Sequence, residues 1–136
     1  MADDEDGTAR PSGNLTIHGY FRRAIRRSPW TSAPAGAVGP IVFGPDRNCA
    51  LFNLEFERAR IVKAIYRCTT CVTLVAFCEH LSELVVGMPT EHALSLEAEY
   101  LLRYHREVPA GRRDRALLAV NALKIAIQCS LQRSER

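Results

Sequence analysis

IVKAIYRCTTCVTLVAFCEHLSELVVG, residues 61–87, changes its hydrophobic period in the middle. The first seven residues are rich in isoleucine, valine and tyrosine, which favour a β-strand. From Thr70 onward the apolar side chains recur at spacings of three and four, as on one face of an α-helix: Cys71, Leu74, Cys78, Leu81 and Val85. The stretch therefore predicts a strand that leads directly into a helix, which ends at Gly87.

The segments on both sides complete an α+β pattern. Residues 52–57 alternate between apolar and polar side chains, and with residues 61–67 they predict an antiparallel hairpin. Further helices are expected over residues 16–27, 90–105 (with Thr90 as N-cap) and 112–132, the last being apolar on nearly every face and so the most buried. We expect a small antiparallel sheet with helices packed on one face, in a single domain over residues 15–133 that follows a disordered acidic leader over residues 1–14.

Composition and charge exclude several function classes. The net charge of +3 is mild and the arginines are dispersed, which argues against a nucleic-acid partner. The longest apolar stretch, residues 72–78, is too short to cross a bilayer, so no membrane partner is expected. The acidic N-terminus does not resemble a secretory signal, and we expect a cytoplasmic protein with reduced thiols.

The cysteines are the candidate chemical groups. Cys68-x-x-Cys71 on its own fits a zinc knuckle, a dithiol redox pair or neither. Cys71 lies at a predicted helix N-terminus, where the dipole favours a thiolate; the alternative is a small buried residue. Cys78 lies two helical turns further on, about 10 Å away, so it and Cys129 are expected to pack in the core. Cys49 is the best remaining partner for the pair.

At this point the order of elements and several strings resemble the U-type iron–sulfur scaffold family, which comprises IscU and the N-terminal domain of NifU. The resemblance covers residues 17–127. IVKAIYRCTTCVTLVAFCEHLSELVVGMPTEHAL follows the family layout of strand, cysteine-bearing helix start and helix-ending glycine, with Cys71 at the second family cysteine. RALLAVNALKIAI resembles the final family helix, and GPDRNCALFNLEF resembles the loop that carries the first family cysteine.

The chain departs from the family pattern at the ligand positions. The His-Cys pair that opens the final family helix falls on Asp114 and Arg115. An ungapped alignment puts Asn48 on the first family cysteine, whereas a one-residue shift restores Cys49 but reverses the facing of the strand unless a bulge absorbs it.

The resemblance implies a protein that holds iron or an iron–sulfur cluster on thiolates and passes it on. The implied ligands are Cys71, Cys49, Cys68 and Asp114, with Arg115 as a fixed positive charge beside them. The implied partners are a cysteine desulfurase and apo iron–sulfur client proteins. Since no nucleophile–base pair or phosphate loop is found, we expect no enzyme activity.

Two alternatives remain open. The first is a scaffold-fold module without a cluster that binds a protein through the apolar face of its last helix or the arginines of its first. The second is a small zinc protein that uses Cys49, Cys68, Cys71 and one of Asp46, His80 or Asp114. His80 is otherwise expected on the solvent side of its helix.

Overall fold

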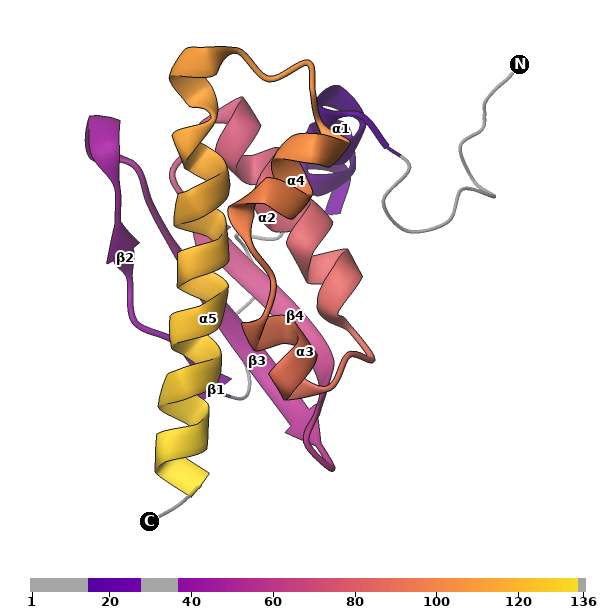
Figure 1. The fold of residues 1–136 in the computed structure, drawn as a ribbon, viewed down its shortest axis with the longest axis vertical. Helices are drawn as coiled ribbons and strands as arrows, with labels where there is room; N and C mark the ends of the chain where they lie inside the picture. The colour runs from indigo at the N-terminus through magenta and orange to yellow at the C-terminus, as the bar shows by residue number, and fades with distance from the viewer. Residues whose placement is uncertain (1–14, 28–36, 135–136) are drawn as a thin grey trace.

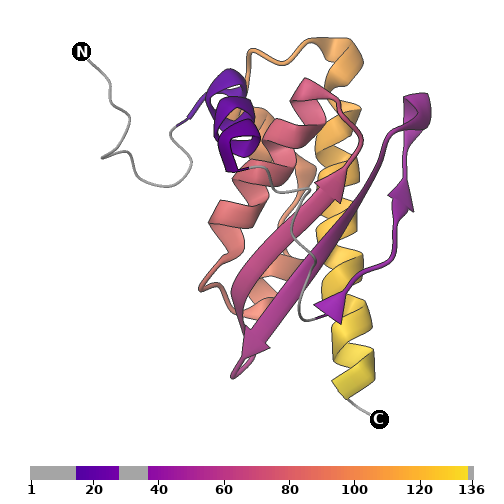
Figure 2. The same ribbon diagram turned by 180° about the vertical axis from the view of Figure 1, so that it is seen from behind.

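The computed structural model describes residues 15–27 and 37–134, and the expected leader lies outside them. The helices are α1 (Ile17–Arg27), α2 (Val72–Val85), α3 (Thr90–Leu94), α4 (Ala98–Tyr104) and α5 (Asp114–Ser134), and short 3-10 turns cover Pro45–Arg47 (η2) and Ala110–Arg112 (η3). The strands are β1 (Ala37–Val38), β2 (Val42–Phe43), β3 (Cys49–Glu57) and β4 (Arg60–Cys68). The α+β class is confirmed, and the helices lie together on one side of the sheet (Figures 1 and 2).

Strand β3 is the centre of the antiparallel sheet. One edge of β3 pairs with β4. The other edge pairs with both β1 and β2, which lie at different positions along its length. The β3–β4 hairpin confirms the sequence prediction. Its two turn residues, Arg58 and Ala59, both have positive φ, which gives a two-residue turn whose twist matches that of the strands. A bulge between Glu55 and Phe56 shifts the register near this turn, far from the cysteines.

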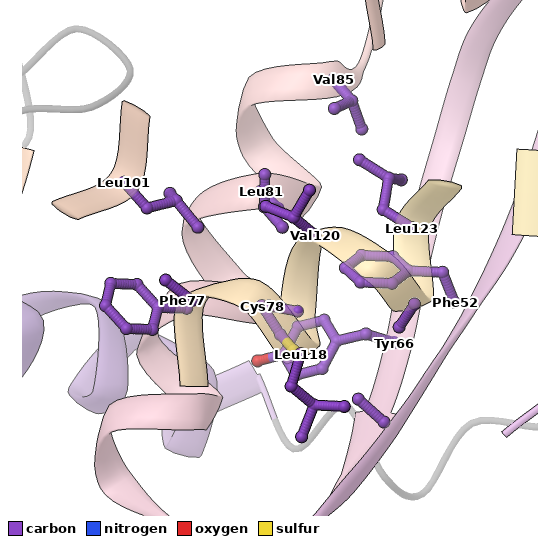
Figure 3. Packing of buried hydrophobic residues seen from close by; sticks show 14 of the residues in the cluster. Phe52, Tyr66, Phe77, Cys78, Leu81, Val85, Leu101, Leu118, Val120 and Leu123 are labelled. Atoms are coloured by element: carbon purple, nitrogen blue, oxygen red, sulfur yellow. The ribbon is translucent and has the colours of Figure 1, made fainter. Parts of the chain in front are cut away.

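The core lies between the sheet and the two long helices α2 and α5. Phe52 and Tyr66 point from the sheet toward the two helices (Figure 3). The buried helix side chains that surround them are Phe77, Cys78 and Leu81 of α2 and Leu118, Val120 and Leu123 of α5. The predicted packing role of Cys78 is confirmed, because its side chain is 0% exposed. No helix within the described ranges is long and apolar enough to cross a membrane.

Two expectations about burial are wrong. The helix with the more completely buried surface is α2, whereas α5 keeps Leu117, Ile125 and Leu131 exposed on one side. His80 is fully buried instead of facing solvent. His80 is buried because α1 packs on the side of α2 away from its apolar stripe. Tyr20 of α1 stacks on the His80 ring, with 4.5 Å between the two ring centroids.

The single helix expected over residues 90–105 is two helices. After α3 the backbone turns at Ser95, whose hydroxyl donates to the carbonyl of His92, and Glu97 is extended before α4 begins. Serine side chains that bond to the nearby backbone compete with helix continuation, which accounts for the break. The N-cap position of α3 is held by Pro89 instead of Thr90.

Candidate functional site

Cys71 occupies the N-cap of α2, as the sequence predicts. Its backbone is extended (φ −116°, ψ 123°), its N–H donates to the Thr69 carbonyl at 2.8 Å, and its carbonyl accepts the first helical hydrogen bond from Val75. The side chain is half-buried. The thiol therefore lies at the junction of β4 and α2, near the positive end of the helix dipole.

Arg115, in the first turn of α5, brings the charged groups of this end of the molecule together. Its side chain is 10% exposed; Nη1 donates to Asp114 Oδ1 at 2.7 Å, and Nη2 lies 3.2 Å from Asp46 Oδ2 in η2. The hydrogen bond to Asp114, and then the interaction with the Cys71 thiol, raise the pKa of Arg115. Two carboxylates and one thiol thus share one fixed cation.

Cys68 is turned toward the core. It pairs directly with Ala50, so both side chains lie on the helix side of the sheet, and its thiol interacts with the thiol of Cys78 on α2. Burial and the contact with Cys68 raise the pKa of Cys78, so this thiol is held protonated. Cys68 therefore contacts the core and is not part of the Arg115 cluster.

Cys49 lies on the opposite face of the sheet. It pairs with Phe43, and it lines a pocket of about 310 Å³ together with Leu51, Arg67 and Cys68. Asn48 lies on the helix side with Ala50, because side chains two apart on an extended chain share a face. Its Oδ1 accepts from the Thr69 hydroxyl at 2.8 Å, and this hydroxyl also receives the Cys49 N–H at 3.3 Å.

The structure does not assemble the expected ligand set. It brings Cys71 and Asp114 together through Arg115 and adds Asp46, but it places Cys68 against Cys78 and Cys49 on the outer face. Across residues 15–27 and 37–134, no three His, Cys, Asp or Glu side chains lie close enough to share an ion. As arranged here, the donor set does not fit a cluster, and the positive charge of the site is supplied by Arg115.

His80, a candidate zinc ligand, belongs to a separate buried cluster. Its Nδ1 lies 2.8 Å from Nε2 of His105, which is 1% exposed and sits just after α4. Burial lowers the pKa of His80 to about 4, and burial also lowers the pKa of His105. No sequence signal links these two residues, because they meet only when the end of α4 folds back on α2 and α1.

Comparisons with known proteins support the fold. A family model described as "NifU-like N terminal domain" matches residues 31–136. No curated protein matches the chain. One similar solved structure, titled "Crystal structure of a hypothetical protein at 2.3 A resolution", superposes with a TM-score of 0.57 at 19% identity, covering 71% of this chain and 84% of that chain.

Proposed function

The chain belongs to the NifU-like N-terminal domain family, an iron–sulfur cluster assembly scaffold family, and we propose that it serves this assembly as a protein-binding member whose own site builds no cluster. The observation that carries the proposal is the contact of the buried Arg115 guanidinium with Asp46, Asp114 and Cys71. The Arg115 guanidinium already pairs with the carboxylates that iron would need as ligands.

Cluster assembly requires several soft thiolate ligands at one point. Among the cysteines, which all lie in the described ranges, Cys71 interacts with Arg115, whereas the free thiol of Cys68 interacts with Cys78 in the core and Cys49 faces the other side of the sheet. Iron entry would have to displace a guanidinium that is held by Asp46, Asp114 and the Gly111 carbonyl, and two further thiols would have to turn. Both costs favour a module that works by binding other proteins.

The partners proposed from the family are a cysteine desulfurase and apo iron–sulfur clients. A protein-binding role is supported by the exposed side of α5, where Leu117, Ile125 and Leu131 are 53%, 37% and 41% exposed. Apolar side chains gathered on one side of a helix favour protein contact.

Anaerobic reconstitution with iron and sulfide tests the proposal. We expect wild type to develop no more charge-transfer absorbance than Cys71→Ser, and elemental analysis of the fresh protein to find neither iron nor zinc in stoichiometric amount. Absorbance in wild type that is lost in Cys71→Ser would overturn the proposal in favour of a remodelled site of Cys71, Cys49, Cys68 and Asp114. Stoichiometric zinc would favour the zinc alternative.

A further inference from the structure

Two free thiols meet where the end of β4 packs on α2. Cys68 pairs with Ala50, so its side chain points to the helix side of the sheet, as does the side chain of Tyr66 two residues before it. Cys78 lies in the second turn of α2 and is fully buried. Figure 3 shows its sulfur beside the Tyr66 ring. Strand register and helix packing therefore bring Cys68 and Cys78 to the same place in the core.

The electrostatics of the buried groups agree with this arrangement. The thiol of Cys78 interacts with the thiol of Cys68, and burial and then this contact raise the pKa of Cys78. Burial, then the Glu79 carboxylate, and then the sulfurs of Cys78 and Cys68 raise the pKa of Tyr66. Both sulfurs therefore lie near the same phenol and near each other.

The two thiols differ in their access to solvent. Cys68 is half-buried and lines the pocket of about 310 Å³ at the end of the sheet, whereas the side chain of Cys78 is 0% exposed. A small oxidant can therefore reach Cys68 first. The sulfur of Cys78 then meets the oxidised sulfur from within the core, where no reagent has to enter.

The remaining thiols are placed less favourably to react with Cys68. Cys71 interacts with the Arg115 guanidinium in the neighbouring cluster, and Cys49 lies on the opposite face of the sheet. Cys129 lies near the other end of α5. The sequence spacing favours a pair of Cys68 and Cys71, but the arrangement of side chains favours the buried thiol of α2 as the partner.

We propose that Cys68 and Cys78 form an oxidation site, at which hydrogen peroxide joins the two residues in a disulfide bond that a dithiol reductant opens again. The Cys68 thiolate attacks the peroxide: an S–O bond forms, the O–O bond breaks, and the leaving hydroxide takes up the proton that Cys68 released. The product is one water and a sulfenic acid at Cys68.

The second step forms the disulfide. The Cys78 sulfur attacks the sulfenic sulfur of Cys68, an S–S bond forms and the S–O bond breaks. The leaving hydroxide takes the Cys78 proton and becomes a second water, so no separate base is needed. In the whole reaction two thiols are oxidised to a disulfide, and one peroxide is reduced to two waters.

The disulfide closes the loop that holds Cys71. It ties the end of β4 to the second turn of α2, and Cys71 lies between the two bonded residues in the sequence. Disulfides of proteins in reducing compartments are usually transient and respond to oxidation. This inference goes beyond the proposed protein-binding function and does not depend on it.

Counting thiols in the full chain tests the oxidation site. The reduced protein is treated with hydrogen peroxide at pH 7.5, the peroxide is removed with catalase, and the chain is unfolded in urea with N-ethylmaleimide. We expect the intact mass to show three labels instead of five, since two of the five cysteines are bonded, and dithiothreitol before labelling should restore all five. Chymotryptic cleavage after Phe77 turns the bridge into two linked peptides, in which Cys71 carries the label.

Cysteine variants identify the two partners. Cys78→Ala and Cys68→Ser should form no bridge, and dimedone should trap the sulfenic acid that Cys68 retains in Cys78→Ala. Cys129→Ala, which changes a cysteine near the other end of α5, is the matched control and should form the bridge at the wild-type rate. If Cys78→Ala does not fold, Cys68→Ser gives the same test at a half-buried position.

Four results would overturn the inference. The first is a bridge between Cys68 and Cys71, and the second is a bridge in Cys78→Ala with the wild-type yield. The third is oxidation of Cys49 or Cys71 to sulfinic acid while no bridge forms. The fourth is a disulfide between two chains, seen as a dimer on a non-reducing gel. Reconstitution of the reduced protein with iron tests the proposed function separately, so the two can fail independently.

Discussion

Arg115 in α5 reaches Asp46 in the turn before β3, with Nη2 3.2 Å from Oδ2. Asp46 and Arg47 have positive φ values of 60° and 62°, a left-handed backbone conformation that aspartate tolerates but that is unfavourable for arginine. The ion pair thus holds a strained turn against the start of α5, and the same guanidinium holds Asp114 and Cys71.

We predict that Arg115→Ala lowers the free energy of unfolding by about 1–2 kcal/mol, since hydrogen bonds to charged groups are lost while the carboxylates of Asp46 and Asp114 remain partly solvated. Arg115→Lys should lose about half as much, because an ammonium cannot bridge both carboxylates as a planar fork does. Urea unfolding at pH 7.5 measures both. Arg103→Ala, at an exposed arginine on α4, should change stability by less than about 0.5 kcal/mol. Equal losses for the Ala and Lys variants would contradict the bridging role.

The thiols should differ in their reaction with iodoacetamide. Reaction requires an accessible thiolate, and Cys78 is fully buried with its pKa raised by burial and by the contact with Cys68. We expect mass spectrometry to find Cys49 and Cys71 alkylated in the native protein while Cys78 stays unmodified until urea unfolds the chain. Alkylation of Cys78 as fast as Cys49 would contradict the buried Cys68–Cys78 contact.

The fold was largely predictable from periodicity. The hairpin and the helix after Cys71 follow from local patterns, and the structure agrees with them to within a few residues. The burial of His80 was not predictable, because periodicity identifies one apolar face and does not say that α1 will cover another. The break at Ser95 depends on one hydroxyl that bonds to the backbone instead of solvent.

The candidate site was predictable only in part. Helix periodicity placed Cys71 at a helix start, and the resemblance placed Asp114 and Arg115 beside it. The facing of Cys49 and Cys68 depends on strand register, where one residue reverses the side of the sheet. The Cys68–Cys78 contact joins β4 to the second turn of α2, and no spacing rule within the sequence anticipates it.

Gly39 should tolerate no side chain. A Cβ there would lie 2.6 Å from the Ala126 Cβ and 2.9 Å from its Cα, where α5 crosses the sheet. We predict that Gly39→Ala costs about 1–3 kcal/mol in urea unfolding through overpacking. Ala126→Gly in the same chain should recover part of this loss, so that the double variant is less destabilised than the sum of the two single changes. Gly111→Ala, where nothing lies within 4 Å, is the control and should be nearly neutral.

The buried His80–His105 pair should make stability depend on pH. Glu107 lies 3.7 Å from His105 Nδ1, which favours a proton on that nitrogen and leaves His105 Nε2 to accept from His80 Nδ1–H. His80 Nε2 is then an unprotonated nitrogen that is buried without a partner in the described part of the chain. Protonation of His80 would put a charge there, beside Tyr20, His105 and the Arg23 guanidinium, with Glu83 alone favouring it.

The direction of the pH effect follows from the pKa of His80, about 4 in the folded protein against 6.5 when unfolded. The unfolded chain binds more protons between these values, so stability is complete above pH 6.5 and falls on acidification toward pH 4, by up to about 3 kcal/mol. Urea unfolding at pH 7.5, 6, 5 and 4.5 measures this loss. His80→Gln should flatten the curve, because the titrating group is removed, whereas His92→Gln, at an exposed position on α3, should keep the wild-type slope. If both variants lose stability on acidification as steeply as wild type, the acid sensitivity arises from the carboxylates instead of the buried imidazoles, and α1 is not held in place by a neutral His80.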